Sequence, residues 1–301
     1  MGGLYQVRPA RAARTQHAPH AFVRRGLLVC AAAVGIATVL ASSAGAQRGG
    51  RFPRDFGMSQ LGGDANGFYT PPDWKGNPPY DGRFTFARIK YRGYGYWSGR
   101  EGPGWSHDYP DAEVHLMKIM REITVMRPFT NFGAMIGGAI VALDDPVLFK
   151  YPISYLSEPG GWFPNPAEMQ GLRNYLLKGG FMIVDDFPVD EWGHFEAVMK
   201  RITPELVPIQ LKGNEPIFDS FFKVDMNRIR RGFSGGGGRN NGAFFGYFEK
   251  NDPTKRLIVL ACYGHDVGES WQWSGQGFEP VDVSNEAFKL GINFIIYALT
   301  H

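Results

Sequence analysis

The sequence has little cysteine, and its N-terminal region has no acidic side chain before Asp55. Two cysteines occur among 301 residues, Cys30 and Cys262. Because Cys30 lies in the apolar stretch 26–43 of a predicted leader, one thiol is left for the remainder, and an internal disulfide is excluded there. Cys262 lies within the apolar run LIVLACY, which predicts a buried and unreactive thiol.

The N-terminal region has the composition of a secretory leader. An arginine pair (24–25) precedes the apolar stretch 26–43, and an A-x-A pattern follows at 44–46. A charged start, an apolar stretch and small residues at the end predict a signal peptide over residues 1–46 and export to the periplasm or cell envelope. The arginine pair also fits the twin-arginine route. Residues 26–43 are long enough to remain as an uncleaved membrane anchor, and these alternatives stay open.

The positive charge of the chain belongs to the predicted leader. The whole sequence has 32 basic and 29 acidic residues, a balance of +3. Residues 1–46 contain five arginines and no acid, which leaves 27 basic residues against 29 acidic ones, a balance of −2. Nucleic-acid binding therefore loses its main support, and we expect no nucleic-acid partner.

The rest of the chain divides into an arm and one domain. Residues 47–82 are rich in Gly, Pro and Asn without an apolar period, which predicts a linker or a surface arm. Regular patterns start at residue 83, so we predict a single α/β domain over 83–301. Within it, the Gly/Arg-rich patch 228–242 predicts a mobile loop, and an anion-gripping lid is the less favoured interpretation of this patch.

Strand and helix patterns alternate along this domain. Alternating or continuous apolar runs predict strands at 83–91, 139–145, 151–157, 181–186 and 256–264. Apolar residues at helical spacing predict helices at 111–125, 165–180, 191–204 and 285–300. Asn165 is expected to cap the second of these helices, and Asn285 is expected near the cap of the fourth. This alternation predicts a mainly parallel sheet with helices on both faces, interrupted by long Gly- and aromatic-rich loops.

Polar side chains follow the predicted strands. Ligands of open α/β sheets bind beyond the carboxyl ends of the strands, so these side chains are candidates for a site. The rim candidates are Asp108, Asp144, Asp185, Asp186, His265 and Asp266. Neighbouring strand residues point to opposite faces, so one member of each Asp-Asp pair is expected to face the crevice while the other caps a helix or binds loop amides.

Several carboxylates at one rim require positive charge nearby, from Arg88, Lys90, Arg92 or a bound metal. A divalent cation such as Mg²⁺ or Ca²⁺ at Asp185, Asp186 and His265 is one hypothesis, since carboxylates with an occasional histidine suit hard cations. The spacing matches no recognised metal motif, and helix capping explains the same acids without a metal.

Aromatic residues form a second group in two segments that should open onto the same rim. They are Tyr94, Tyr96, Trp97, Trp105, Trp271 and Trp273. Flat rings with polar edges suit stacking on sugars or contact with the side chains of a partner. The alternative is that these rings pack on each other and order a long loop.

Six stretches of the domain, among them GWSHDYPDAEVHL and LRNYLLKGGFMIVDD, carry a resemblance to a known family. Over roughly residues 83–300 the chain resembles the exported bacterial family catalogued as domain of unknown function 4159. The resemblance implies a flavodoxin-like fold similar to class I glutamine amidotransferases, and relatives that tend to look membrane-associated. Where those enzymes have the nucleophilic cysteine, this sequence has Asp185-Asp186, so amidotransferase chemistry is not expected.

Three functions remain open at this stage. The first is a non-catalytic binding or assembly module at the cell envelope, with a protein or a glycan as its partner and residues 26–43 as a possible tether. The alternative is a metal- or carboxylate-dependent hydrolase acting on a sugar or cell-wall substrate, with rim acids as catalytic groups. The third is a structural envelope protein whose rim acids only cap helices.

Overall fold

The computed structural model describes residues 76–92, 104–131, 136–187, 189–229 and 242–301. The predicted leader, most of the predicted arm, the Gly/Arg-rich patch except its ends, and the aromatic residues Tyr94, Tyr96 and Trp97 lie outside the described residues. The predictions made for them therefore stay predictions. In the described part, no helix is both long and apolar enough to span a bilayer.

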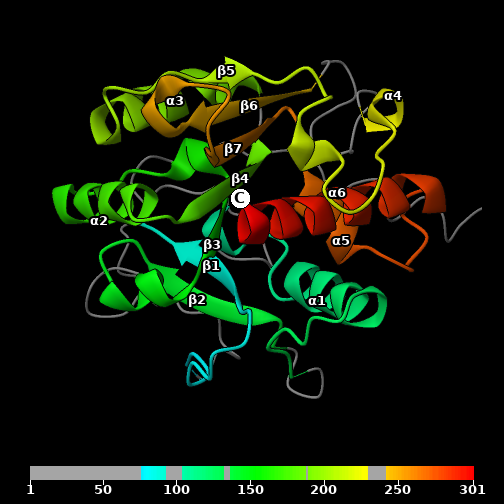
Figure 1. Cartoon of the computed structure of the whole chain (residues 1–301). Helices are drawn as coiled ribbons and strands as arrows, with labels where there is room; N and C mark the ends of the chain where they lie inside the picture. The colour runs from blue at the N-terminus through cyan, green and yellow to red at the C-terminus, as the bar shows by residue number, and fades with distance from the viewer. Residues whose placement is uncertain (1–75, 93–103, 132–135, 188, 230–241) are drawn as a thin grey trace, which may run out of the picture. The chain divides into compact units, whose positions relative to one another are not determined.

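Seven strands form one sheet in the order β2-β1-β3-β4-β7-β6-β5 (Figure 1). The parallel strands are β1 (Phe86–Lys90), β2 (Gly138–Ala142), β3 (Ile153–Ser157), β4 (Phe181–Phe187) and β7 (Leu257–Tyr263). Antiparallel pairing then adds β6 (Ala243–Phe248) and β5 (Ile209–Gln210) at one edge. Counted among themselves, the parallel strands follow the order 2-1-3-4-5 of flavodoxin-like folds. The predicted α/β, flavodoxin-like, mainly parallel sheet is confirmed.

Helices cover both faces of the sheet, as Figure 1 shows. One face carries α1 (Asp111–Ile123), α5 (Val267–Gln272) and α6 (Val281–Thr300), with the short α4 (Met226–Ile229) beside α6. The other face carries α2 (Pro166–Leu177) and α3 (Trp192–Ile202). Each face has its own apolar cluster. Because both faces are covered, the central strands carry continuous apolar runs, as residues 257–263 of β7 and residues 181–184 of β4 do.

Local sequence chemistry accounts for the best-defined helix. The Asn165 side chain accepts hydrogen bonds from the N–H groups of Ala167 and Glu168, and Glu168 accepts one from the N–H of Asn165 at 2.7 Å. Pro166 occupies the first helical position, and Gly179, with φ +108°, follows the end of the helix. This is the predicted capping box with a glycine stop.

Every predicted element overlaps an observed one, but two details differ. Helix α6 begins at Val281, directly after Pro280, so Asn285 lies inside the helix and the prediction that it stands near the cap is wrong. Proline needs no hydrogen-bond partner for its nitrogen, so the chain enters the helix there. Helix α5 and strands β5 and β6 were not predicted, because α5 and β5 are short and β6 depends on its antiparallel pairing with β7.

Candidate functional site

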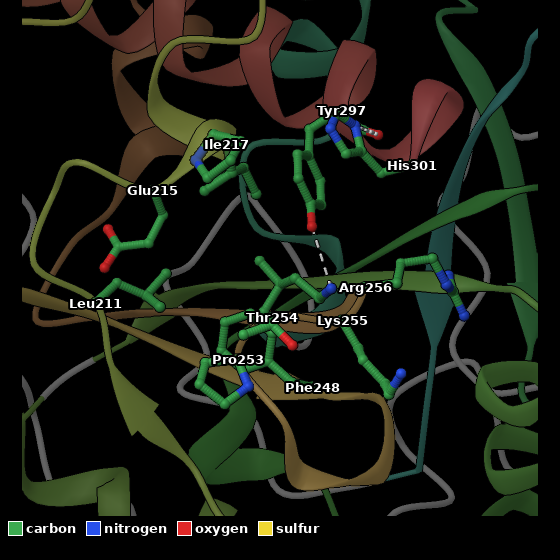
Figure 2. Close-up of a pocket in the computed structure, with 12 residues that line it drawn as sticks. Leu211, Glu215, Ile217, Phe248, Pro253, Thr254, Lys255, Arg256, Tyr297 and His301 are labelled. Carbon is green, nitrogen blue, oxygen red and sulfur yellow. Dashed lines mark hydrogen bonds between the residues drawn. The ribbon is translucent and has the colours of Figure 1, made fainter.

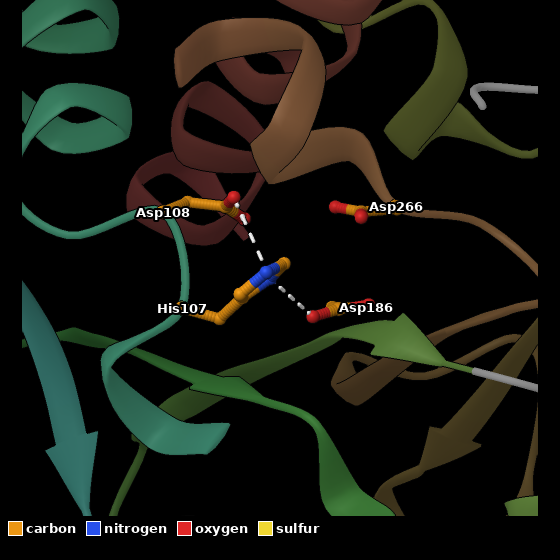
Figure 3. Close-up of side chains that lie close together, drawn as sticks. All are labelled: His107, Asp108, Asp186 and Asp266. Carbon is orange, nitrogen blue, oxygen red and sulfur yellow. Dashed lines mark ion pairs between the residues drawn. The ribbon is translucent and has the colours of Figure 1, made fainter. Parts of the chain in front are cut away.

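Four side chains from three distant segments meet beyond the carboxyl ends of the parallel strands. They are His107 and Asp108 from the segment after β1, Asp186 from the end of β4, and Asp266 from the turn after β7 (Figure 3). One potential ligand atom from each lies within 4.8 Å of those of the others. We call these four residues the acid–histidine cluster. Its location is the edge at which flavodoxin-like sheets bind ligands.

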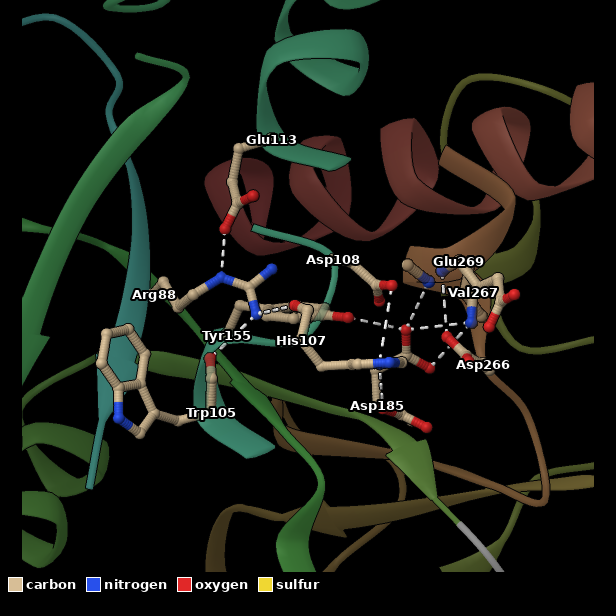
Figure 4. Close-up of polar contacts among 12 residues, drawn as sticks. Arg88, Trp105, His107, Asp108, Glu113, Tyr155, Asp185, Asp266, Val267 and Glu269 are labelled. Atoms are coloured by element: carbon tan, nitrogen blue, oxygen red, sulfur yellow. Dashed lines mark hydrogen bonds and ion pairs between the residues drawn. The ribbon is translucent and has the colours of Figure 1, made fainter. Parts of the chain in front are cut away.

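Arg88 holds the segment after β1 in place (Figure 4). This side chain is fully buried, and its Nη1 donates to the backbone oxygens of Trp105 at 3.0 Å and His107 at 2.7 Å. Its Nε donates to Glu113 of α1, and its guanidinium lies 4.9 Å from the centre of the Tyr155 ring. Arg88 therefore fixes the backbone that presents His107, and Glu113 already balances its charge.

The two aspartates that end β4 have different roles. Asp185 is buried and accepts hydrogen bonds from the Tyr155 hydroxyl at 2.9 Å and from the N–H groups of Val267 at 3.0 Å and Gly268 at 2.8 Å. Asp186 has φ +52°, and its Oδ2 lies 2.7 Å from Nδ1 of His107. In this pair the two side chains are divided between different contacts: Asp186 lies against His107, while Asp185 holds the start of α5. The left-handed backbone of Asp186 helps to separate the two side chains.

Asp266 begins α5. Its Oδ1 accepts a hydrogen bond from the N–H of Glu269 at 2.9 Å, as an N-cap residue does. The start of this short helix is thus held by two buried aspartates, Asp266 and Asp185. Because Asp266 is both cap and cluster member, the position of α5 sets the shape of the cluster.

Asp108 is the most unusual member. Its exposed fraction is 0%, and neither carboxylate oxygen accepts a hydrogen bond from the residues that the structure describes. Nδ1 of His107 lies 3.5 Å from its Oδ1. A Cβ atom at Gly268 would stand 2.7 Å from Oδ2 of Asp108, so the glycine permits the close approach of α5. Buried carboxylates normally have hydrogen-bond partners, so this one calls for a ligand.

Burial dominates the electrostatics of the cluster. It raises the pKa values of Asp108 and Asp266 well above the usual range of aspartate, and repulsion from Asp186 raises both further. For Asp108, His107 acts in the opposite direction. Burial also raises the pKa of Asp185 to about 6, although its hydrogen bonds with Tyr155 and α5 lower it. Carboxylates in this position are stabilised in their charged form by a nearby cation.

Three of the predicted rim residues lie outside the cluster. Asp144 is exposed and follows the edge strand β2. Strands β1 and β3 lie between β2 and β4, the strand that carries Asp186. His265 is buried and stacks on Phe244 at 4.6 Å, and burial lowers its pKa to about 4. Asp185 supports the cluster from behind through α5. The structure therefore corrects the predicted metal set of Asp185, Asp186 and His265, because only Asp186 belongs to the cluster.

His107 is the residue that sequence reasoning did not select. It precedes Asp108 in the stretch GWSHDYPD, whose place in the family resemblance was a signal that could have directed attention to it. An isolated histidine in a long loop has no periodicity or spacing to mark it. Its role depends on the hydrogen bond between Arg88 and its backbone oxygen.

The aromatic residues within the described part are not one surface. Trp105 and Trp271 are buried, and the indole N–H of Trp271 donates to the backbone oxygen of Ala287 at 2.9 Å. These two rings offer no open face to a ligand, which favours the packing alternative for them. Trp273 is half-buried, and the centre of its ring lies 4.6 Å from that of Phe278, a side chain that is 70% exposed.

A pocket of about 250 Å³ lies away from the cluster (Figure 2). Its lining includes Arg256 and Leu257, at the start of β7, and Tyr297 near the end of α6. Since the cluster follows the opposite end of β7, the pocket opens at the amino ends of the parallel strands. Arg256 is engaged there, since it donates to Glu249, to the backbone oxygen of Leu176 in α2 and to that of Gly179, which follows the cap residue Lys178. The pocket contains no cluster residue.

A carboxyl group near the cluster allows a prediction of pH dependence. Glu191, in the 3₁₀ helix Val189–Glu191, accepts a hydrogen bond from the N–H of Gly160 at 2.9 Å. Burial raises its pKa to about 7, and Asp186 and Asp190 contribute. Because the folded state holds this proton more tightly than the unfolded chain, the stabilisation is complete below the unfolded pKa and is lost as the pH rises through 7.

We therefore expect Glu191→Gln to stabilise the protein at about pH 8.5 by about 1 kcal/mol, a value reduced for partial solvent exposure, and to change little at about pH 5. Urea unfolding at the two pH values measures the difference. Asp144→Asn, an exposed acid that is not among the causes of the raised pKa of Glu191, is the control. Equal effects of Glu191→Gln at both pH values would contradict the prediction.

Fold and cluster together define a flavodoxin-like α/β domain with buried acids and a histidine at the carboxyl edge of its parallel strands. The chain belongs to the family described as a domain of unknown function (DUF4159), whose match covers residues 85–299. No curated protein matches the chain.

Proposed function

We propose that this domain is a metal- or carboxylate-dependent hydrolase whose active centre is the acid–histidine cluster. The observation that carries the proposal is the fully buried carboxylate of Asp108, which accepts no hydrogen bond from the described residues and faces His107 at the carboxyl edge of the sheet. Groups held without their normal partners in a buried position are typical of active sites rather than of scaffolds.

The chemistry of the residues fits the activation of water. His107 contacts Asp186, and such a histidine–carboxylate pair moves a proton to or from a reacting group in a metal-free centre, or supplies ligands in a metal-dependent one. Thiol chemistry is not supported, because Cys262 is buried on β7 and burial raises the pKa of its thiol well above the usual value. A sugar or cell-wall polymer is the proposed substrate class, in keeping with a predicted exported protein.

A chromogenic panel of glycosides, carboxylic esters and phosphate esters tests this function. We expect the full chain to hydrolyse at least one class, and His107→Ala and Asp186→Asn to lower kcat/KM by about 100-fold or more. Asp144→Asn, an exposed acid outside the cluster, should leave the rate unchanged. If no class is hydrolysed under any metal condition, or if the cluster variants hydrolyse as fast as the Asp144→Asn control, the hydrolase proposal fails.

A second candidate function is binding of a glycan or an envelope protein without catalysis. The observation in its favour is the exposed ring of Phe278 beside Trp273, which offers an apolar face after the end of α5. Such a pair suits stacking on a sugar or capture of a partner side chain. Under this proposal the predicted leader delivers the domain to the envelope, with or without a tether at residues 26–43, and nucleic acid is not a partner.

Binding to immobilised cell-wall glycan distinguishes this candidate. We expect Phe278→Ala to weaken retention about 10-fold, while Phe163→Ala, an exposed aromatic residue after β3, has no effect. Retention that is equal in the wild type and Phe278→Ala would remove the support for this surface.

A further inference from the structure

We propose that the acid–histidine cluster binds one divalent transition-metal ion, of the Zn²⁺ or Mn²⁺ class, through His107, Asp108, Asp186 and Asp266. The inference deepens the proposed hydrolase by naming its cofactor. The role of the ion in catalysis rests on the proposed function. The binding of the ion rests on the geometry of the cluster alone.

The distances fit a single ion. Metal–ligand distances for nitrogen and carboxylate oxygen are about 2.0–2.2 Å, so donors on opposite sides of one ion stand roughly 4.2 Å apart. The candidate donor atoms of the cluster lie within 4.8 Å of one another. Side-chain movements well below about 1 Å therefore bring all four to coordination distance. In Figure 3 the side chains of His107, Asp108, Asp186 and Asp266 surround a common space.

The three carboxyl groups of the cluster favour binding of a cation. Three carboxylates share this space with one imidazole, and Asp108 is buried with neither oxygen accepting a hydrogen bond from the described residues. The buried guanidinium of Arg88 is engaged with Glu113 and two backbone oxygens. The oxygens of Asp108 would coordinate a divalent ion, whose charge would offset the repulsion between Asp108, Asp186 and Asp266.

The donor types select the kind of ion. Imidazole nitrogen together with carboxylate oxygen is the ligand set of Zn²⁺, Mn²⁺ and Fe²⁺, whereas Mg²⁺ and Ca²⁺ prefer oxygen alone. Nδ1 is the His107 atom that faces both Asp108 and Asp186. The sequence suggested a hard cation on the strength of its carboxylates, whereas the imidazole of His107 within the cluster favours a transition metal. A transition metal in a hydrolase centre polarises the substrate and lowers the pKa of bound water.

The cluster also has the supporting contacts that metal sites use. Asp185 binds the Tyr155 hydroxyl and two N–H groups of α5, the helix that begins at Asp266 (Figure 4). Arg88 orients the backbone of His107. Outer contacts of this type fix the direction of first-sphere ligands, and their removal typically weakens metal binding by 10-fold or more.

Metal analysis and thermal melting of the purified full chain test the inference. We expect close to one equivalent of bound Zn²⁺ or Mn²⁺, and a melting temperature that EDTA lowers by about 5 °C and that either metal restores. Mg²⁺ and Ca²⁺ should not restore it. Asp108→Asn, which keeps the shape and removes a buried charge, and His107→Ala should both lose the response, whereas Asp144→Asn should keep it.

The outcomes separate the inference from the proposed function. The metal site would be overturned if neither EDTA nor any of the four metals changed the melting temperature. It would also be overturned if Asp108→Asn and His107→Ala responded to metal as the wild type does. Hydrolysis that persists undiminished in metal-free protein would also overturn the metal as cofactor while leaving a carboxylate-dependent hydrolase in place. Metal binding that depends on the cluster, without hydrolysis of any substrate class, would support the site and remove the proposed function alone.

Discussion

Replacement of Arg88 by leucine is expected to lower the free energy of unfolding by about 3–5 kcal/mol. The change leaves the buried carboxylate of Glu113 without its cation, and burial already raises the pKa of this group. It also removes the donor to the backbone oxygens of Trp105 and His107. Denaturant unfolding followed by intrinsic tryptophan fluorescence measures the loss.

Two controls identify the cause of this loss. In the double variant Arg88→Leu/Glu113→Leu no buried charge is left alone, so part of the stability should return. Arg83→Leu breaks the exposed pair with Asp81 and should have a far smaller effect than Arg88→Leu. A loss below about 1 kcal/mol for Arg88→Leu would contradict the assignment of Arg88 as the anchor of the His107 segment.

The second large effect is expected at Asp185. Asp185→Ala removes the acceptor of the Tyr155 hydroxyl and of the N–H groups of Val267 and Gly268, all of them buried. Each buried donor left without a partner costs about 1–3 kcal/mol, so we expect a loss of about 3 kcal/mol or more in unfolding free energy. The response to metal should also weaken, since α5 begins at the ligand Asp266.

The neighbouring Asp186→Asn is the matched control. Asparagine tolerates the left-handed φ of +52° and keeps the size of the side chain, so its effect on unfolding should be small. Because Asp186 is a proposed ligand, this variant should nevertheless lose the thermal response to Zn²⁺ or Mn²⁺. Equal destabilisation by Asp185→Ala and Asp186→Asn would contradict the division between a supporting and a binding aspartate.

The secondary structure could be predicted wherever local chemistry decides it. The capping box of Asn165 and Glu168 marks the start of α2, and the apolar run of residues 181–184 before Asp185 marks β4. The antiparallel strands β6 and β5 were not predicted, because their pairing depends on a neighbouring strand, β7 for β6 and β6 for β5, rather than on their own residues. Helix α5 is short, and its start is held largely by Asp185, which is distant in the sequence.

The candidate site could be predicted only in part. Asp108, Asp186 and Asp266 were all expected at the rim, because the strand-end rule for open α/β sheets applies to each segment separately. His265 was expected among them, but its ring stacks on Phe244 in the apolar interior. The participation of His107 could not be seen, because it requires the contact between Arg88 and a residue far along the chain.

The sequence by itself determined the alternation of strands and helices, the mainly parallel sheet and the edge at which acids gather. These features follow from periodicity, capping and the direction of parallel strands, which act over a few residues. Only the tertiary structure decided which of the acids meet. Two features of the folded chain make that choice. The left-handed backbone of Asp186 directs its side chain to His107, and the hydrogen bonds of Asp185 with α5 hold the start of this helix, where Asp266 lies.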